Sequence, residues 1–137
     1  MPGEQLLVVE DNETSMKLFR DVLQASGYRT LEAASGAHAV ELAAEHDPDL
    51  VLMDIQLPDI DGVEALRRLR ADRRTAAIPV LALTAQAMDG VRERLLAAGF
   101  DGYISKPVDI LELVAAVRQL CDGRARPISR PPSPPPP

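Results

Sequence analysis

The stretch LVLMDIQLPDIDG, residues 50–62, decides the fold of this 137-residue chain. It opens with four consecutive apolar residues, Leu50 to Met53, which run directly into the carboxylate of Asp54. A short unbroken apolar run is typical of a strand covered on both faces, as in a parallel sheet. A carboxylate at the end of such a strand is costly to bury unless another group pairs with it. The stretch therefore predicts a buried strand whose last acid needs a partner.

Short apolar runs alternate with segments of helical spacing along the chain. Besides Leu50–Met53, clear strand candidates are Leu6–Val9 and Val80–Leu83, and weaker ones are Arg29–Ala33 and Gly102–Ser105. Apolar residues recur at three and four positions in three stretches between or after these runs: Met16, Phe19, Val22 and Leu23; Val63, Leu66 and Leu69; Ile110, Leu113, Val114, Val117 and Leu120. Five strands separated by helices imply right-handed crossovers. We therefore expect an α/β fold, a doubly wound five-stranded parallel sheet with five helices.

Residues that favour helix ends stand beside the helical segments. The candidate N-caps are Asn12, Ser35 and Asp109, and the candidate C-caps are Gly27, Gly99 and Gly123. His38 and His46 fall on a predicted surface helix, and we expect both to be solvated.

Composition separates an acidic body from a basic tail. Seven of the twelve prolines lie between Pro127 and Pro137, and the segment from Gly123 carries three arginines and no acid. With a net charge of −6 for the whole chain, residues 1–122 carry −9. We predict a domain over residues 1–122 and a disordered Arg/Pro-rich tail over residues 123–137. An acidic body argues against nucleic-acid binding.

The remaining composition favours a cytoplasmic protein. No apolar run approaches the roughly 20 residues that span a bilayer, so no membrane association is expected. The N-terminus lacks the basic flank and cleavage site of a secretory signal, and a single cysteine, Cys121, excludes an internal disulfide.

Polar residues follow the strands that this fold would place side by side. Glu10 and Asp11 follow the first strand, Asp54 and Thr84 end two others, and Lys106 follows the last. In doubly wound sheets, ligands bind beyond the carboxyl ends of the strands. Three carboxylates at one edge repel one another unless cations neutralise them, and Mg²⁺ suits an incomplete shell of oxygen ligands. Such a site can stabilise phosphoryl oxygens, and Asp54 can then be phosphorylated as a nucleophile.

Each of these residues also has an ordinary structural explanation. Asp54 and the PDIDG turn could serve chain reversal, Asp11 could cap a helix, and Thr84 could be a plain strand residue. Lys106 could be a solvated lysine and Tyr103 a core residue. The functional interpretation rests on the arrangement of all of them together.

Four motifs in order resemble the receiver domains of bacterial two-component response regulators. They are VVEDN at 8–12, the 50–62 stretch, VLALTA at 80–85 and GYISKP at 102–107, and the resemblance extends from Gln5 to about Leu120. It implies a flavodoxin-like, receiver-type fold. The sequences of these motifs are most similar to those of single-domain members of the family that control the cell cycle and division in alphaproteobacteria.

The resemblance also implies a role for each matching residue. Asp54 would be the phosphoacceptor, and Mg²⁺ would be held by Glu10, Asp11, Asp54 and the backbone carbonyl of Gln56. The phosphoryl oxygens would be held by Thr84 and Lys106, and Thr84 and Tyr103 would form the conformational switch. Lys106–Pro107 would be a cis peptide. Gln86 occupies a position that affects hydrolysis rates in relatives.

Partners follow from the same resemblance. A histidine kinase or a phosphotransfer protein would donate the phosphoryl group, and the domain would catalyse only its own phosphorylation and dephosphorylation. A downstream protein would bind the face formed by residues 88–98, Gly102–Ser105 and residues 109–120. The sequence names neither the kinase nor the target, and it leaves the lifetime of the phosphoryl group and the oligomeric state undetermined.

Two other classes, and one variant of the same class, compete with this interpretation. A haloacid-dehalogenase-like phosphatase needs a second aspartate two residues after the first, where this chain has Gln56. A flavodoxin-like binding module needs a phosphate loop after the first strand, where Glu10 and Asp11 would repel phosphate. A receiver that acts without phosphorylation stays open, although every active-site position is filled.

Overall fold

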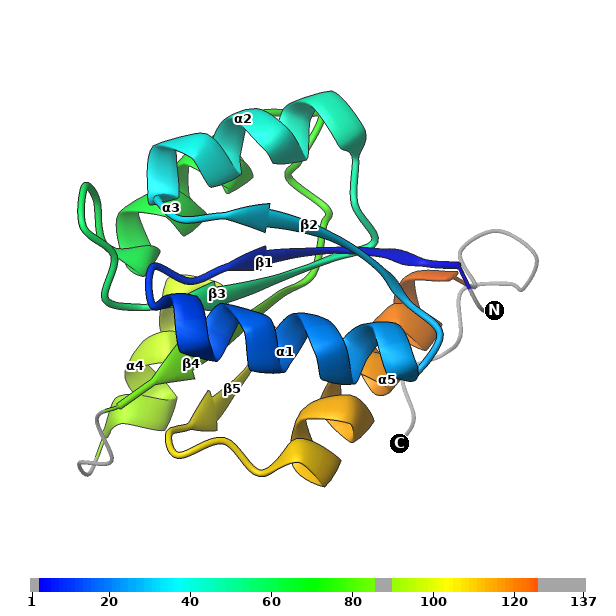
Figure 1. Ribbon diagram of the computed structural model, residues 1–137. Coiled ribbons are helices and arrows are strands. Elements are labelled where there is room, and N and C mark those ends of the chain that lie inside the picture. The colour runs from blue at the N-terminus through cyan, green and yellow to red at the C-terminus, as the bar shows by residue number, and fades with distance from the viewer. Residues whose placement is uncertain (1–2, 86–89, 126–137) are drawn as a thin grey trace, which may run out of the picture.

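The computed structural model describes residues 3–85 and 90–125, in which five strands alternate with five helices (Figure 1). The strands are β1 (Gln5–Val9), β2 (Arg29–Ala33), β3 (Leu50–Asp54), β4 (Val80–Thr84) and β5 (Gly102–Ser105). The helices are α1 (Glu13–Ala25), α2 (Gly36–His46), α3 (Gly62–Ala71), α4 (Val91–Ala98) and α5 (Ile110–Ala125). The predicted alternation is confirmed.

The strands form one parallel sheet in the order β2-β1-β3-β4-β5. The chain moves outward from β1 to β2, then returns past β1 to β3 and continues to β4 and β5 in the other direction. The strand order therefore reverses between β1 and β3, the position where doubly wound sheets bind ligands. Because β1 and β3 are neighbours, the residues that follow them lie side by side at the carboxyl edge.

Helices lie on both faces of the sheet (Figure 1), and a separate apolar cluster fills the space under each layer of helices. Helices α1 and α5 cover one face, and α2, α3 and α4 cover the other. Strand β3 supplies both clusters, since side chains alternate along a strand: Leu50 and Leu52 face α1 and α5, whereas Val51 and Met53 face the other helices. All five residues of β3 are buried, as its unbroken apolar run predicted.

Most helix ends have the expected caps. The Asn12 side chain accepts a hydrogen bond from the Ser15 amide, and Ser35 accepts one from the His38 amide. Asp109 accepts from the amide of Leu111 at 2.9 Å. Gly27 and Gly99 adopt positive φ values of 100° and 113°, which only glycine takes easily. His38 and His46 are exposed, as expected.

The prediction that Gly123 ends the last helix is wrong, because α5 continues to Ala125. Leu113, Val117 and Cys121 form a buried stripe on α5, which keeps the helix packed on the sheet until two residues before Gly123. A glycine inside a helix costs about 1 kcal/mol, too little to end a helix anchored in this way. Residues 126–137 of the predicted tail lie outside the described residues, as do Gln86 and Met88. Within the stretch 88–98 that was predicted to contribute to the binding face, helix α4 begins at Val91.

Candidate functional site

The predicted site residues meet at the carboxyl edge of the sheet. Asp54 and Thr84 are the last residues of β3 and β4, Glu10 and Asp11 follow β1, and Lys106 follows β5. Glu10, Asp11 and Asp54 each offer a carboxylate oxygen, and these oxygens all lie within 4.8 Å of one another. The register explains this convergence, since Val9 lies opposite Met53 and the next residue of each strand is an acid.

Lys106 is the cation of this cluster. Its Nζ lies 2.7 Å from Oδ2 of Asp54 and 3.3 Å from Oε1 of Glu10. The Glu10 and Asp54 side chains are 1% and 6% exposed, whereas that of Lys106 is 28% exposed. Two nearly buried acids therefore share one half-buried lysine.

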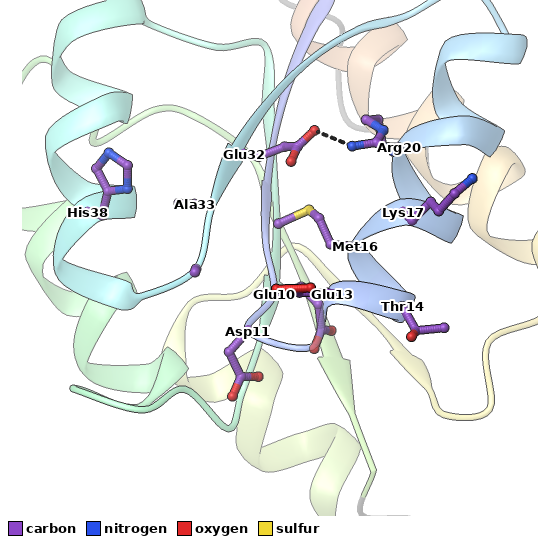
Figure 2. Close-up of a pocket in the computed structure, with 11 residues that line it drawn as sticks. Glu10, Asp11, Glu13, Thr14, Met16, Lys17, Arg20, Glu32, Ala33 and His38 are labelled. Atoms are coloured by element: carbon purple, nitrogen blue, oxygen red, sulfur yellow. Dashed lines mark hydrogen bonds and ion pairs between the residues drawn. The ribbon is translucent and has the colours of Figure 1, made fainter.

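Backbone amides fix the two buried carboxylates from the other side. The Gln56 amide donates to Oδ1 of Asp54 at 3.0 Å, and the Asn12 amide donates to Oε2 of Glu10 at 3.1 Å. Each carboxylate is thus held between an amide of its own loop and the ammonium of Lys106. Asp11 is exposed, and Figure 2 shows its carboxylate pointing away from Met16 and Arg20.

The electrostatics of the cluster reflect crowding of negative charge. Burial raises the pKa of Glu10, and the neighbouring Asp54 raises it further, against the lowering effect of the Asn12 amide and of Lys106. Partial burial alone would lower the pKa of Lys106. Its hydrogen bond and charge interaction with Asp54, together with the charge of Glu10, outweigh burial and raise that pKa. The raised pKa keeps Lys106 an ammonium at neutral pH, and the raised pKa of Glu10 makes its carboxylate easier to protonate than an ordinary glutamate.

Thr84 ends β4, the strand next to β3, and Tyr103 lies on β5 opposite Ala82 of β4. Thr84 is 3% exposed, and its backbone carbonyl accepts a hydrogen bond from the Lys106 amide at 2.8 Å. Tyr103 is half-buried and packs against the apolar cluster under α2, α3 and α4. The peptide bond between Lys106 and Pro107 is cis, as the resemblance implies.

The loop between β3 and α3 is held by two residues whose roles the sequence did not reveal. Asp59 accepts hydrogen bonds from the amides of Gly36 and Ala37 at 2.8 and 2.9 Å, and so ties this loop to the start of α2. At Gly62, an added Cβ would lie 2.8 Å from the carbonyl oxygen of Asp54. The start of α3 therefore packs directly on the backbone of Asp54, and only glycine leaves room for this. In the sequence, Asp61 and Gly62 are typical turn residues, and no nearby residue indicates the contacts that Asp59 and Gly62 make.

A groove of about 760 Å³ adjoins the cluster between α1, β2 and the start of α2 (Figure 2). Glu10 and Asp11 line one end of it, and an ion pair between Arg20 and Glu32 lies at the other. The cluster is therefore open to solvent on the Asp11 side, where a ligand can enter.

The donor set of the cluster suits a hard divalent cation. Glu10, Asp11 and Asp54 supply only carboxylate oxygens, which Mg²⁺ and Ca²⁺ prefer, whereas Zn²⁺ favours nitrogen and sulfur. Burial is the main cause of the raised pKa of Glu10, and the repulsion from Asp54 that adds to it is what a cation would relieve. Among the described residues, no helix is long and apolar enough to cross a bilayer.

The fold and this cluster together define the class of protein. The family model described as response regulator receiver domain matches residues 6–118, and the chain belongs to this family. It is therefore a phosphoacceptor protein of two-component signalling, whose partner class is the histidine kinase.

Individual relatives agree with this assignment. The polar-differentiation response regulator DivK of Brucella ovis is 47% identical over 115 residues, which cover 84% of this chain and 94% of DivK. Among solved structures, the receiver domain of sensor histidine kinase PA1611 from Pseudomonas aeruginosa, with a magnesium ion coordinated in its active-site cleft, is 37% identical with a TM-score of 0.81. That match covers 88% of this chain and 98% of the other. The receiver domain of a histidine kinase from Syntrophus aciditrophicus is 30% identical with a TM-score of 0.83, covering 95% and 98%.

Proposed function

We propose that Asp54 accepts a phosphoryl group from a histidine of a kinase or phosphotransfer protein. The observation that carries this proposal is the environment of Asp54: a nearly buried carboxylate bound to Lys106 within 4.8 Å of two further acids. A carboxylate placed only for structure would not be surrounded by like charges, because they destabilise it.

The reaction follows from these contacts. A carboxylate oxygen of Asp54 attacks phosphorus, the P–N bond to the donor imidazole breaks, and the bonding pair returns to that nitrogen. Mg²⁺, bound by Glu10, Asp11, Asp54 and the Gln56 carbonyl, would supply positive charge for the phosphoryl oxygens. Lys106 and Thr84 lie at the ends of adjacent strands and would hold the remaining oxygens. In hydrolysis, a water oxygen attacks phosphorus, the P–O bond to Asp54 breaks, and inorganic phosphate leaves the regenerated Asp54 carboxylate.

The test uses acetyl phosphate and Mg²⁺ with intact-mass measurement. Wild-type protein should gain the mass of one phosphoryl group, and Asp54→Asn should gain none. Asp47→Asn is a matched control, since Asp47 is an exposed aspartate in the left-handed region, which asparagine also tolerates. Equal labelling of wild type and Asp54→Asn would refute the assignment.

We further propose that phosphorylation is transmitted through Thr84 and Tyr103 to the face formed by α4, β5 and α5. A phosphoryl group adds acceptor oxygens that draw the Thr84 hydroxyl toward Asp54 and so free space for Tyr103. A downstream protein would bind this face. The similarity to DivK supports a role in polar differentiation or division control.

Thr84→Ala tests the transmission step, with Thr84→Ser as the control that keeps the hydroxyl. Phosphorylated Thr84→Ala should show much smaller chemical-shift changes at Tyr103 than wild type, while Thr84→Ser should resemble wild type. Equal changes at Tyr103 in all three proteins would show that the hydroxyl is not the link.

A further inference from the structure

The loop between β3 and α3, residues 55–61, is fixed to the sheet at its base. The Gly62 amide donates to the Ile55 carbonyl at 2.8 Å, so the two ends of the loop are bonded to each other. The Ile55 amide in turn donates to the Leu83 carbonyl of β4 at 2.9 Å. A Cβ added at Gly62 would lie 2.8 Å from the carbonyl oxygen of Asp54 and 2.9 Å from Cα of Ile55. The base of the loop therefore has a fixed position relative to Asp54.

The tip of the same loop is held by the start of α2. Each carboxylate oxygen of Asp59 accepts one hydrogen bond, Oδ1 from the amide of Gly36 and Oδ2 from the amide of Ala37. The next residue, Ile60, packs on the backbone of Gly36, since a Cβ added there would lie 2.5 Å from Cγ1 of Ile60. Two neighbouring loop residues therefore contact the same turn of α2, one through hydrogen bonds and the other through an apolar side chain.

Gln56 lies between these two points of attachment. Its amide donates to Oδ1 of Asp54 at 3.0 Å, and its backbone carbonyl is the uncharged ligand in the proposed Mg²⁺ site. Only Leu57 and Pro58 separate Gln56 from Asp59. The ring of Pro58 fixes its own φ, and its clash with the preceding residue restricts Leu57 to extended conformations. A shift of Asp59 is therefore passed along a stiff segment to the peptide group that carries the Gln56 carbonyl.

We propose that Asp59 is a positioning residue for the metal site: by holding the loop on α2, it sets the direction of the Gln56 carbonyl and thereby the affinity for Mg²⁺. This inference rests on the proposed function, in which Gln56 is a Mg²⁺ ligand. Asp59 binds the start of α2, whereas the acids of the cluster follow or end β1 and β3, so Asp59 acts through the loop. Groups that directly orient a metal ligand typically contribute about 10- to 100-fold in affinity, and because two residues intervene here, we expect a smaller factor of about three- to tenfold.

Coupling between two sites is reciprocal, so the metal should also act on the contact with α2. If Asp59 favours Mg²⁺ binding, bound Mg²⁺ must stabilise the hydrogen bonds of Asp59 to the same extent. In the full-length wild-type protein, the Ala37 amide should therefore exchange with solvent about three- to tenfold more slowly when Mg²⁺ is saturating. The Arg74 amide donates to Oδ1 of Asp72 at the other end of α3, and its exchange rate should be the same with and without Mg²⁺.

Two substitutions of Asp59 separate its hydrogen bonds from its charge. Asp59→Asn and Asp59→Ala remove the same charge, but the first keeps one acceptor oxygen and the second keeps none. In a Mg²⁺ titration followed by amide chemical shifts, the dissociation constant should rise about three- to tenfold in Asp59→Ala and by a smaller factor in Asp59→Asn. Asp72→Asn is the matched control, because it removes one charge from an aspartate that also accepts a backbone amide, and it should bind Mg²⁺ as tightly as wild type.

Labelling by acetyl phosphate gives a second readout. The Mg²⁺ concentration at half-maximal rate should rise in Asp59→Ala by the same factor as the dissociation constant, while the rate at saturating Mg²⁺ should equal that of wild type, because Lys106 still contacts Asp54. Equal dissociation constants for Asp59→Ala and wild type, equal losses in Asp59→Asn and Asp59→Ala, or an Ala37 exchange rate that Mg²⁺ leaves unchanged would each overturn this inference alone. Absence of Mg²⁺ binding by the wild type would overturn the proposed metal site and this inference together.

Discussion

Replacing Lys106 with methionine should destabilise the Mg²⁺-free protein by about 2–3 kcal/mol at neutral pH. Methionine retains much of the side-chain volume and removes the cation that contacts both Asp54 and Glu10. Removing one partner of a buried ion pair typically costs about 3–5 kcal/mol, because it leaves a buried charge unpaired. The Lys106 side chain is 28% exposed, so water already screens the ammonium and the effect should fall below that range.

Urea unfolding measures this loss directly. With an m-value of about 1.5 kcal/mol/M, the midpoint of Lys106→Met should lie roughly 1.5–2 M below that of wild type. Double-mutant cycles with Asp54→Asn and Glu10→Gln should give the larger coupling energy for Asp54, since Nζ lies 2.7 Å from Asp54 and 3.3 Å from Glu10. The loss should also shrink as the pH is lowered, because Glu10, whose pKa is raised by burial, then becomes neutral.

A divalent cation should partly replace the missing ammonium. Mg²⁺ should therefore raise the unfolding midpoint of Lys106→Met more than that of wild type, since it relieves more repulsion in the variant. A free energy of unfolding of Lys106→Met within about 0.5 kcal/mol of the wild-type value, together with additive double mutants, would show that the acids are already well solvated. Lys106 would then contribute little to holding the two buried acids in the folded state.

Two sets of substitutions and one truncation test the surroundings of the site. Hydrogen bonds from the amides of Ala37, Gly36 and Ile60 lower the pKa of Asp59 to about 2. The ionised carboxylate therefore contributes stability above the ordinary pKa of about 4, and this stability is lost as the pH falls toward 2. The difference in urea midpoint between wild type and Asp59→Asn should be constant above about pH 4 and become smaller below it. Gly62→Ala should lower the free energy of unfolding by about 1–3 kcal/mol and slow labelling of Asp54, because the new Cβ meets backbone atoms. Gly36→Ala is the control: its Cβ meets the side chain of Ile60, which can rotate, so the loss of stability in the same urea assay should be smaller. Truncation after Ala125 should leave the rate of labelling by acetyl phosphate unchanged, because all the residues of the carboxylate cluster and of the two apolar clusters precede this position. A large change in that rate would show that the removed residues act on the domain.

The sequence predicted the strands and the convergence of the site well, for a physical reason. Residues such as Leu50–Met53 are buried on both faces, so their apolar runs are unbroken, and parallel pairing then brings the ends of β1 and β3 together. Once that order is known, the meeting of Glu10, Asp54 and Lys106 follows from their position after each strand.

Contacts between distant loops could not be predicted in this way. Asp59 binds amides 22 and 23 residues away, and Arg70 binds the Gly99 carbonyl 29 residues away. Neither contact leaves a periodic signal, since one aspartate in a turn or one arginine on a helix is compatible with many environments. The end of α5 was mispredicted for a related reason: burial of Cys121 against the sheet outweighed the local preference of Gly123.

The charge balance of the site explains why one small group can change the whole domain. Three carboxylates and one ammonium give the cluster a net charge of −2, which one divalent cation would cancel. Phosphorylation of Asp54 would replace a charge of −1 by up to −2 and carry it outward from the strand end. Hydrogen-bond donors that can move must then compensate the added negative charge. Two such donors, Thr84 and Lys106, lie at the ends of β4 and β5, which are the strands before and after α4 in the chain. Helix α4 buries only two residues, Val91 and Leu95, and its cap Gly90 offers no side-chain hydrogen bond. Helices α1, α2, α3 and α5 each bury at least three residues, so α4 is the helix with the fewest anchors in the core. We therefore expect a charge change at Asp54 to displace α4 more than the other helices.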